Sequence, residues 1–397
     1  MRFRPHGLRS RTWPAVLWPL VICVAGCPHR TPPAADSAGD ADLRRKNLFA
    51  TFDADARDLS LVNAYLLELA CYVGDKGTFE LDKTLAAWGF DRRRDFHDLR
   101  TSTYGYVASN DRMVLVTFGG TDVMNARDLL SDADALQLVY DPRYCETQGA
   151  RVHRGFRDSL STVIDGVTEE VRRQAEMTAP PAPPAPPAPP APATPVATTS
   201  PTTAPDGGAV VTPPRRKKVW VAGHSRGGAF AVLASAAFAR EVDFPEVAGV
   251  YTFGQPRVGN GPFVQALTEG VSNGRGGVPL FRFVNRDDPV PLVPPEAPAP
   301  AGRLGISLDY QHGGTLVLLR ADGRVTRGSG ADERRSLTLR DLSDPRAAGA
   351  SVTNHYQPAY QAALYAAVTD PARVDEPAWR PTVQANYLAD ALPKPAQ

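Results

Sequence analysis

A serine between two glycines offers a candidate nucleophile in the second half of the chain. Ser225 lies in the motif Gly223-His224-Ser225-Arg226-Gly227, between an apolar run of strand length and a stretch of small residues. A sharp turn from a strand into a helix exposes such a hydroxyl, and larger side chains at the two glycine positions would clash there. We therefore expect Ser225 to act as a nucleophile rather than as a cap at the start of a helix.

A serine hydroxyl needs a histidine base, and the base needs a carboxylate that orients it. In α/β-hydrolases the acid and then the histidine follow the serine along the chain. Only two histidines follow Ser225, namely His312 and His355. The adjacent carboxylates Asp287 and Asp288 come shortly after an apolar run, and their spacing does not separate one from the other. A position just before the last amphipathic segment favours His355 over His312 as the base.

The negative oxygen that forms during acyl transfer needs two N–H donors. One should be the backbone N–H of Arg226, the residue after the nucleophile. The other should come from a loop that follows an early strand, and the sequence Phe118-Gly119-Gly120-Thr121 fits that place. Thr121 could add its hydroxyl to the same site.

The pattern of apolar residues predicts an α/β fold. Continuous apolar runs of strand length are typical of strands buried on both faces of a parallel sheet. Helical segments alternate with them, as in right-handed βαβ units. The predicted strands are 113–118, 218–222, 249–253, 280–284 and 314–320, the last entering an Asp-Gly turn, and the predicted helices are 59–70, 156–174, 227–239 and 360–367.

A Pro-rich segment interrupts this pattern. Residues 178–214 consist of Pro-Ala repeats followed by Thr, Ser and Gly, a composition that cannot bury a core and favours an extended or disordered chain. The segment could link two domains, but the sequences on either side look like consecutive pieces of one α/β unit. We expect an insertion in a surface loop, since the entropic cost of loop closure grows only slowly with length.

The N-terminus predicts export and a lipid anchor. Four arginines precede an apolar run, 13–26, which is short for a membrane span and suits a signal peptide. Val24-Ala25-Gly26-Cys27 resembles a bacterial lipobox, in which the cysteine thiol receives the lipid; an ordinary signal peptide is the alternative. We expect a signal peptide over 1–26, lipid on Cys27, a tether over 27–50, and a monomer anchored in the bacterial cell envelope, in the periplasm or at the outer membrane.

Composition narrows the possible partners. Lys plus Arg (44) nearly balance Asp plus Glu (43), and loss of four arginines with the signal peptide would change the formal net charge from +1 to −3. Neither value provides an attractive field for nucleic acid, so none is expected as a partner. The motifs of metal, dinucleotide and redox-cysteine sites are absent, so we expect no cofactor and no metal. Cys71 and Cys145 would remain after processing, and whether they pair is left open.

These segments together resemble the class 3 lipases, which are fungal-lipase-like α/β-hydrolases. The resemblance extends roughly over residues 55–370, without the Pro-rich insertion, and several blocks carry it in order. They are Val114–Thr121, Val152–Phe156, Val221–Gly228, Tyr251–Asn260, Asp288–Pro291 and Tyr310–Thr315. The Phe-Gly-Gln-Pro-Arg-Val-Gly sequence in the fourth block is the most specific of them.

The resemblance implies roles for individual residues. It implies Ser225 as nucleophile, Asp288 as acid and His355 as base, with Thr121 and Arg226 as oxyanion donors. It also implies an α/β-hydrolase fold, with a mostly parallel central sheet flanked by helices.

Two positions depart from the family pattern. Gly119 stands where the family usually has Arg, and Arg226 stands where Leu is common, which would place a cation beside the acyl site. The family's lid would fall within 122–138.

The expected organisation is a single hydrolase domain, 51–177 with 215–375, followed by a C-terminal tail, 376–397. The expected activity is hydrolysis of lipid carboxylic esters, as by a triacylglycerol lipase, through an acyl-enzyme. A phospholipase A1 or a short-chain esterase is the alternative among hydrolases. A non-catalytic envelope lipoprotein that uses the fold for binding is the alternative outside that class.

Overall fold

The computed structural model describes residues 43–44, 46–75, 78–120, 138–176, 216–269, 277–294, 309–333, 351–381 and 385–395. These residues belong to one compact unit. The expected signal peptide, Cys27, most of the tether and the Pro-rich insertion lie outside the described residues. Within the described part of the chain, no helix combines the length and the apolar character needed to cross a bilayer.

An eight-stranded sheet forms the centre of this unit, in the order β1-β2-β3-β6-β7-β9-β11-β12. The five strands from β3 to β11 pair in parallel, and antiparallel strands complete both edges. The strands are β1 (Arg92–Asp98), β2 (Thr103–Ser109), β3 (Met113–Phe118), β6 (Lys218–His224), β7 (Val247–Phe253), β9 (Leu280–Asn285), β11 (Thr315–Leu319) and β12 (Val325–Arg327).

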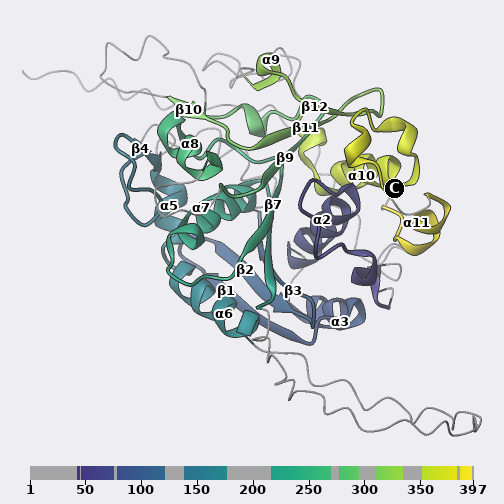
Figure 1. Ribbon diagram of the computed structural model, residues 1–397, viewed down its shortest axis with the longest axis horizontal. Helices are drawn as coiled ribbons and strands as arrows, with labels where there is room; N and C mark the ends of the chain where they lie inside the picture. The colour runs from purple at the N-terminus through teal and green to yellow at the C-terminus, as the bar shows by residue number, and fades with distance from the viewer. Residues whose placement is uncertain are drawn as a thin grey trace, which may run out of the picture. The chain divides into compact units, whose positions relative to one another are not determined.

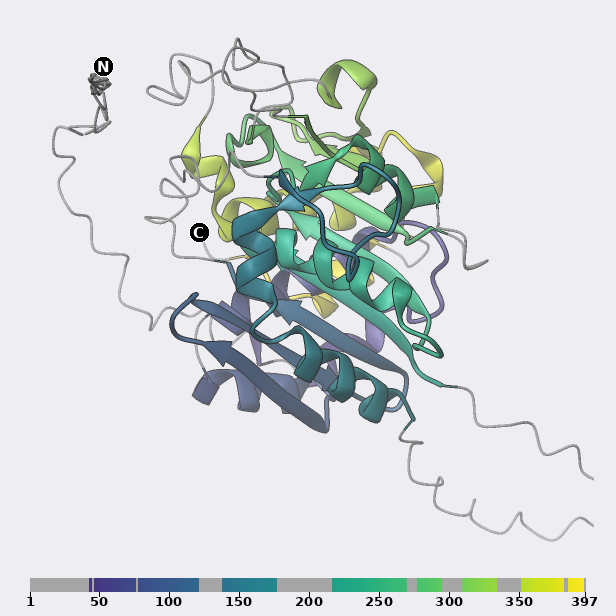
Figure 2. The ribbon, with the colours of Figure 1, turned by 90° about the vertical axis from the view of Figure 1, so that its left-hand side faces the viewer.

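Helices cover both faces of this sheet (Figures 1 and 2). One face carries α2 (Leu61–Asp75), α3 (Thr78–Trp88), α10 (Gln357–Thr369) and α11 (Ala385–Ala391). The other carries α5 (Arg154–Leu160), α6 (Ile164–Glu176), α7 (Arg226–Arg240) and α8 (Gly261–Glu269). A mostly parallel sheet with helices on both faces is the α/β-hydrolase architecture that the sequence predicts.

The alternation of side chains along β3 shows why its sequence is continuously apolar. Met113 and Leu115 belong to the core beneath α2, whereas Val114 and Val116 belong to the core beneath α7. Successive residues of a strand point to opposite faces, so a strand covered on both faces needs apolar residues throughout.

Shorter elements lie around the main sheet. A four-stranded sheet has the order β10-β8-β5-β4. Its strands are β4 (Leu138–Val139), β5 (Val152–His153), β8 (Gly259–Asn260) and β10 (Tyr310–Gln311). The remaining elements are η1 (Leu48–Thr51), η3 (Val290–Leu292), α9 (Gly330–Glu333), η5 (Val352–His355), η6 (Pro371–Arg373) and η7 (Pro377–Trp379).

The predicted helix over 156–174 is wrong in one respect, because it is two helices. α5 ends at Leu160 and α6 begins at Ile164. Between them, the hydroxyls of Ser161 and Thr162 donate to backbone carbonyls three residues earlier. Such local hydrogen bonds compete with the helical pattern, and they explain the break.

The packed core extends past both expected domain boundaries. Leu48 and Phe49, in the segment expected to be a tether, are buried in the core beneath α2. Trp379, Leu388 and Leu392, in the segment expected to be a tail, are buried in the same core. Apolar side chains at these positions stabilise the fold by leaving water, so both segments contribute to it.

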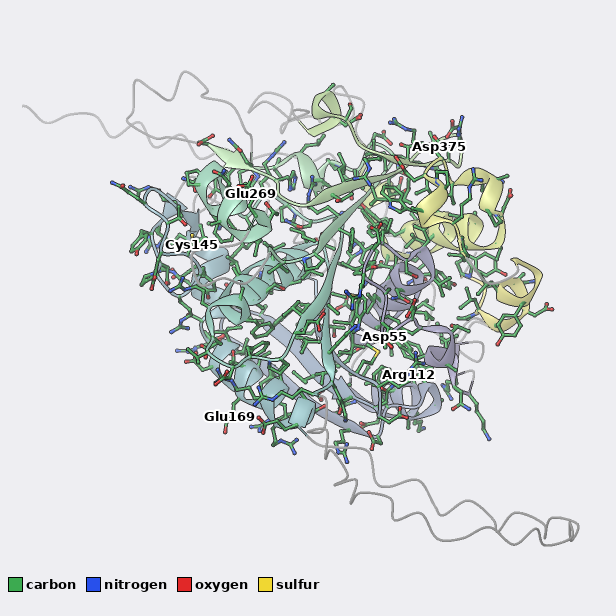
Figure 3. All side chains as sticks on the ribbon, viewed as in Figure 1. Asp55, Arg112, Cys145, Glu169, Glu269 and Asp375 are labelled. Carbon is green, nitrogen blue, oxygen red and sulfur yellow. The ribbon has the colours of Figure 1, made fainter. Side chains whose placement is uncertain are left out.

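The two described cysteines are free and buried. Cys71 belongs to the core beneath α2 and Cys145 to the core on the opposite face of the sheet. Figure 3 labels Cys145, which lies on the α5 side. The question that the sequence left open is therefore answered in favour of two separate thiols.

Candidate active site

Ser225 lies at the turn between β6 and α7, where the sequence predicts it. Its φ of 55° and ψ of −128° are rarely adopted by a residue with a side chain. The N–H of Ser225 donates to the carbonyl of Phe253 on β7 at 2.8 Å, which ties the strained turn to the neighbouring strand. A strained serine between a strand and a helix is the nucleophile elbow of α/β-hydrolases.

Close backbone contacts require both glycines of the motif. A Cβ atom on Gly223 would lie 2.1 Å from the carbonyl oxygen of Gly227, and one on Gly227 would lie 2.1 Å from the carbonyl oxygen of Phe118. Because these neighbours are backbone atoms, they cannot move aside as the end of a side chain can. The tight approach of β3, β6 and α7 therefore admits only glycine at both positions, as the motif predicts.

His355 and Asp288 form a buried pair. His355 is in η5, just before α10, and Asp288 is in the loop after β9. Nδ1 of His355 donates to Oδ2 of Asp288 at 2.9 Å, and the two side chains are 2% and 0% exposed. This bond places the neutral imidazole's proton on Nδ1 and leaves Nε2 as an acceptor. Nε2 is buried and makes no hydrogen bond with the described residues, which is the state that a general base requires.

Further contacts hold the Asp288 carboxylate in place. Oδ2 also accepts from the hydroxyl of Tyr360 on α10 at 2.7 Å, and Oδ1 accepts from the N–H of Val290 at 2.9 Å. Burial and the nearby Asp288 carboxylate raise the pKa of Tyr360, so its hydroxyl stays a donor. Gly254, with φ +60°, passes so close that a Cβ atom would lie 2.8 Å from the His355 ring and 2.9 Å from Asp288 Oδ2.

The neighbouring Asp287 has a different place. Its side chain accepts from Nδ2 of Asn354, and its carbonyl accepts from the N–H of Ser351 at 3.0 Å. Asp287 thus ties the loop after β9 to the segment that carries His355. The geometry brings Asp288, and not Asp287, to the histidine, which spacing alone did not decide.

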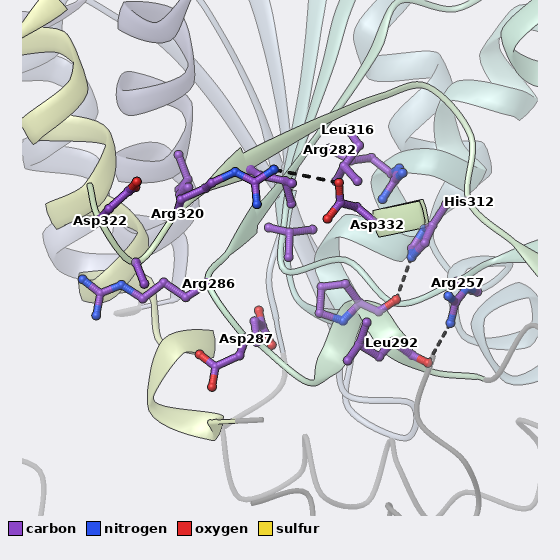
Figure 4. A pocket seen from close by; sticks show the side chains of 16 residues that line it. Arg257, Arg282, Arg286, Asp287, Leu292, His312, Leu316, Arg320, Asp322 and Asp332 are labelled. Atoms are coloured by element: carbon purple, nitrogen blue, oxygen red, sulfur yellow. Dashed lines mark hydrogen bonds and ion pairs between the residues drawn. The ribbon is translucent and has the colours of Figure 1, made fainter. Parts of the chain in front are cut away.

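His312, the other histidine that the sequence left open, lies elsewhere. Its Nε2 donates to the carbonyl of Pro291 at 2.7 Å. Burial and the cations of Arg282 and Arg257 hold its pKa well below the ordinary value. His312 and Asp288 both line a cavity of about 620 Å3, and Figure 4 shows His312 among the side chains around it. Neither Ser225 nor His355 lines this cavity, so it is not the place where an acyl group would meet the serine.

A second buried histidine, His224 of the motif, supports the backbone of His355. Its Nε2 donates to the carbonyl of His355 at 2.8 Å, and its Nδ1 lies 3.0 Å from Oε1 of Glu68 on α2. Because a carbonyl only accepts, the Nδ1–Glu68 bond requires one further proton shared by the two side chains. Burial raises the pKa of Glu68; burial also opposes the charge on His224, but Glu68 raises the pKa of His224 overall.

Of the two expected oxyanion donors, only Arg226 lies within the described residues. Arg226 is the first residue of α7, and its N–H is among those at a helix start that lack an intrahelical acceptor. Its guanidinium donates to the carbonyl of Thr101 at 2.6 Å and lies 4.8 Å from the centre of the Phe230 ring. The cation is therefore held at the turn between β1 and β2. Thr121 and the expected lid up to residue 137 lie outside the described residues.

Two polar residues beside this site were missed by the sequence analysis. Tyr360 and Glu68 lie inside helical apolar patterns, where they pass as ordinary helix residues. The signal that could have found Glu68 is an acid among buried leucines, since a buried carboxylate needs a partner. Among the described residues, no group of three or more His, Cys, Asp or Glu is placed to hold a metal ion.

Comparison with known protein sequences finds similarity in the part of the chain that contains Ser225. Residues 210–297 match the family model described as Lipase (class 3). This segment is similar to the class 3 lipases. Lipases of Rhizopus niveus and Rhizopus oryzae are each 29% identical over 207 residues, which is 51% of this chain and 40% of the relative. The secreted mono- and diacylglycerol lipase 1 of Fusarium solani is 42% identical over 78 residues, which is 20% of this chain and 21% of the relative.

The chain thus spans 40% of the length of the Rhizopus lipases that it matches. Among solved structures, a triacylglycerol lipase described as having a serine protease triad at its catalytic centre is 20% identical, with a TM-score of 0.47, and the match covers 74% of this chain and 92% of that one. The triacylglyceride lipase of Rhizomucor miehei is also 20% identical, with a TM-score of 0.46, over 74% of this chain and 91% of that one.

The contact of Gly254 with the His355–Asp288 pair gives this lipase-like site a testable feature. We expect Gly254→Ala to lower kcat/KM for an ester by about 10²-fold or more, because an added Cβ must displace the pair and a shift of about 1 Å costs on that scale. Steady-state kinetics and thermal unfolding measure the effect.

Gly89→Ala is the matched control. Gly89 also has a positive φ, +95°, but its added Cβ would meet nothing nearer than 3.9 Å. It should show the strain cost of about 1 kcal/mol without the loss of activity. Equal kcat/KM values for the two variants would contradict the role assigned to Gly254.

Proposed function

We propose that this protein is a serine hydrolase that cleaves carboxylic esters of lipids through an acyl-enzyme intermediate. One combination of features supports this most: a strained serine at the elbow, and a buried histidine bonded to a buried aspartate. His224, the residue before Ser225, bonds the carbonyl of His355 and so holds the histidine next to the elbow. A nucleophile, a base and an orienting acid in this arrangement suit acyl transfer.

In the proposed reaction, the hydroxyl oxygen of Ser225 attacks the ester carbonyl carbon while Nε2 of His355 takes the hydroxyl proton. The N–H groups of Arg226 and Thr121 stabilise the negative oxygen of the tetrahedral intermediate. The intermediate expels the alcohol, which receives the proton from Nε2, and leaves the acyl group on Ser225. Asp288 stays ionised throughout and stabilises the imidazolium.

Water completes the cycle by the same route. His355 takes a proton from the water as it attacks the acyl carbon, and Nε2 returns the proton to Ser225 as the carboxylic acid leaves. The names of the matched relatives are those of lipases, one of them a mono- and diacylglycerol lipase. For this reason we take lipid esters as the substrate class.

Replacing the nucleophile tests the reaction. We expect Ser225→Ala to abolish hydrolysis of p-nitrophenyl esters, because no other group would attack the carbonyl, while circular dichroism and thermal unfolding remain close to those of the unaltered protein. A fluorophosphonate should label the unaltered protein at Ser225, as read by peptide mass spectrometry. Undiminished turnover by Ser225→Ala would contradict the proposal, and an unaltered protein that neither labels nor turns over ester would favour the non-catalytic binding module.

A second assay addresses the substrate class. The unaltered protein, with Ser225→Ala as the blank, is assayed on esters of increasing acyl length, with and without an emulsified interface. We expect the highest kcat/KM on long-chain acylglycerols. A preference for short soluble esters would favour the esterase, and a preference for diacyl phospholipids cleaved at the first position would favour phospholipase A1.

We also propose secretion through the signal peptide 1–26 and lipid attachment at Cys27, supported by the arginine-rich start and the lipobox-like sequence. In a bacterial host, the protein should partition with membranes, and Cys27→Ser should release it to the soluble fraction. Equal partitioning of both would contradict the lipid anchor.

A further inference from the structure

Tyr104 on β2 occupies the space beside Gly119 in the loop after β3. A Cβ atom on Gly119 would lie 1.7 Å from Cε2 and 2.0 Å from Cζ of the Tyr104 ring. The backbones also pair, since the N–H of Gly119 donates to the carbonyl of Tyr104 at 3.0 Å. Gly119 stands at the position where class 3 lipases usually have Arg. The ring of Tyr104 explains this departure, because it leaves no room for a side chain.

The hydroxyl of Tyr104 reaches the next residue of the loop. It lies 2.6 Å from the carbonyl oxygen of Gly120 and 2.6 Å from Oδ1 of Asp75, at the end of α2. Gly120 in turn packs against the turn that carries Ser225, which we call the nucleophile turn. A Cβ atom on Gly120 would lie 3.2 Å from the carbonyl oxygen of His224 and 3.5 Å from Cβ of Ser225. One tyrosine therefore contacts both described residues of the loop that adjoins the serine.

The carbonyl of Gly120 matters because a peptide group is planar and trans. The C=O of one residue and the N–H of the next point in opposite directions within the same rigid plane. A hydrogen bond that fixes the Gly120 oxygen therefore fixes the direction of the N–H that follows it. That N–H is the oxyanion donor expected from the sequence.

A single phenolic proton cannot serve two acceptors. Tyr104 has one O–H, while Gly120 and an ionised Asp75 both only accept. A carboxylate is the stronger acceptor, so it would draw the proton away from the carbonyl. A protonated Asp75 would instead donate to the Tyr104 oxygen and leave the phenolic proton to Gly120.

Several groups face the Asp75 carboxyl. They are Glu68 on its own helix, Tyr104 on β2, His224 at the end of β6 and Gln357 at the start of α10. Solvent reaches the carboxyl, yet protein surrounds it closely enough for burial to raise the pKa of Asp75 to about 7.

We propose that Tyr104 is a positioning residue: its ring and hydroxyl hold Gly119 and Gly120 against the nucleophile turn, and Asp75 is the partner that competes for its proton. This inference rests on the proposed function, because the direction of the N–H after Gly120 affects rate only if it stabilises an oxyanion.

Removing the hydroxyl tests the first half. Tyr104→Phe should lower kcat for a p-nitrophenyl ester by about tenfold, less than the ~10²–10³-fold loss expected when an oxyanion donor is deleted, with KM changed by less than about twofold. Tyr106→Phe is the matched control, because Tyr106 is two residues along the same strand and its hydroxyl donates to the carbonyl of Ala70 at 3.0 Å, inside α2. Equal kcat values for the two variants would overturn the role of Tyr104.

A pH series tests the second half. Asp75→Asn keeps a donor toward Tyr104 at every pH, so the ratio of its kcat to that of the unaltered protein should rise severalfold as the pH increases through about 7. The ratio cancels any pH dependence that both proteins share. In the Tyr104→Phe background, Asp75→Asn should leave the ratio flat. A flat ratio with Tyr104 present, or the same rise without it, would overturn the role of Asp75.

Fluorophosphonate labelling separates this inference from the proposed function. Prolonged reaction should label Ser225 completely in the unaltered protein and in Tyr104→Phe, although more slowly in the variant. Labelling of both at equal rates, together with equal kcat, would overturn the positioning role and leave the hydrolase assignment standing. An unaltered protein with neither label nor turnover would overturn both.

Discussion

The hydrogen bond between Nδ1 of His355 and Oδ2 of Asp288 is the contact on which the candidate site depends most. It joins two segments that are 67 residues apart, and it sets which ring nitrogen of the histidine can accept a proton. Much of the nearby structure serves to keep it. Gly254 lacks the side chain that would collide with both partners, and Tyr360 donates to the same carboxylate oxygen. A buried carboxylate stabilises one arrangement only when its hydrogen bonds are made, and Asp288 accepts from His355, Tyr360 and the N–H of Val290.

A second set of contacts connects the serine turn, the histidine and the loop of Gly120. Glu68 on α2 bonds His224, and His224 bonds the backbone of His355. From the end of the same helix, Asp75 reaches Tyr104 and, through it, Gly120. Helix α2 therefore contacts the surroundings of both the base and the loop proposed to supply an oxyanion donor. A rearrangement of this helix would affect both at once, which links the packing of one sheet face to the chemistry of the serine.

The sequence predicts the central part of the fold because burial on two faces leaves a simple pattern. Strands β3, β6, β7 and β9 read as continuous apolar runs, and the glycines around Ser225 are required by backbone contacts that any such elbow shares. Strand β1 was missed because it is half-exposed and rich in Arg and Asp, which gives no apolar run. Spacing could not choose between Asp287 and Asp288, because adjacent residues differ only in the direction of their side chains. The partner of the Arg226 guanidinium could not be predicted either, because its acceptor, the carbonyl of Thr101, is remote in sequence.

A crystal structure of the fluorophosphonate adduct tests the account most directly. The phosphorus should be bonded to Oγ of Ser225, with Nε2 of His355 within hydrogen-bond distance of the adduct and Nδ1 still bonded to Asp288. A phosphonyl oxygen should accept from the N–H of Arg226 at about 2.7–3.1 Å. An adduct on another residue, or a His355 ring turned away from Ser225 with its bond to Asp288 broken, would contradict it.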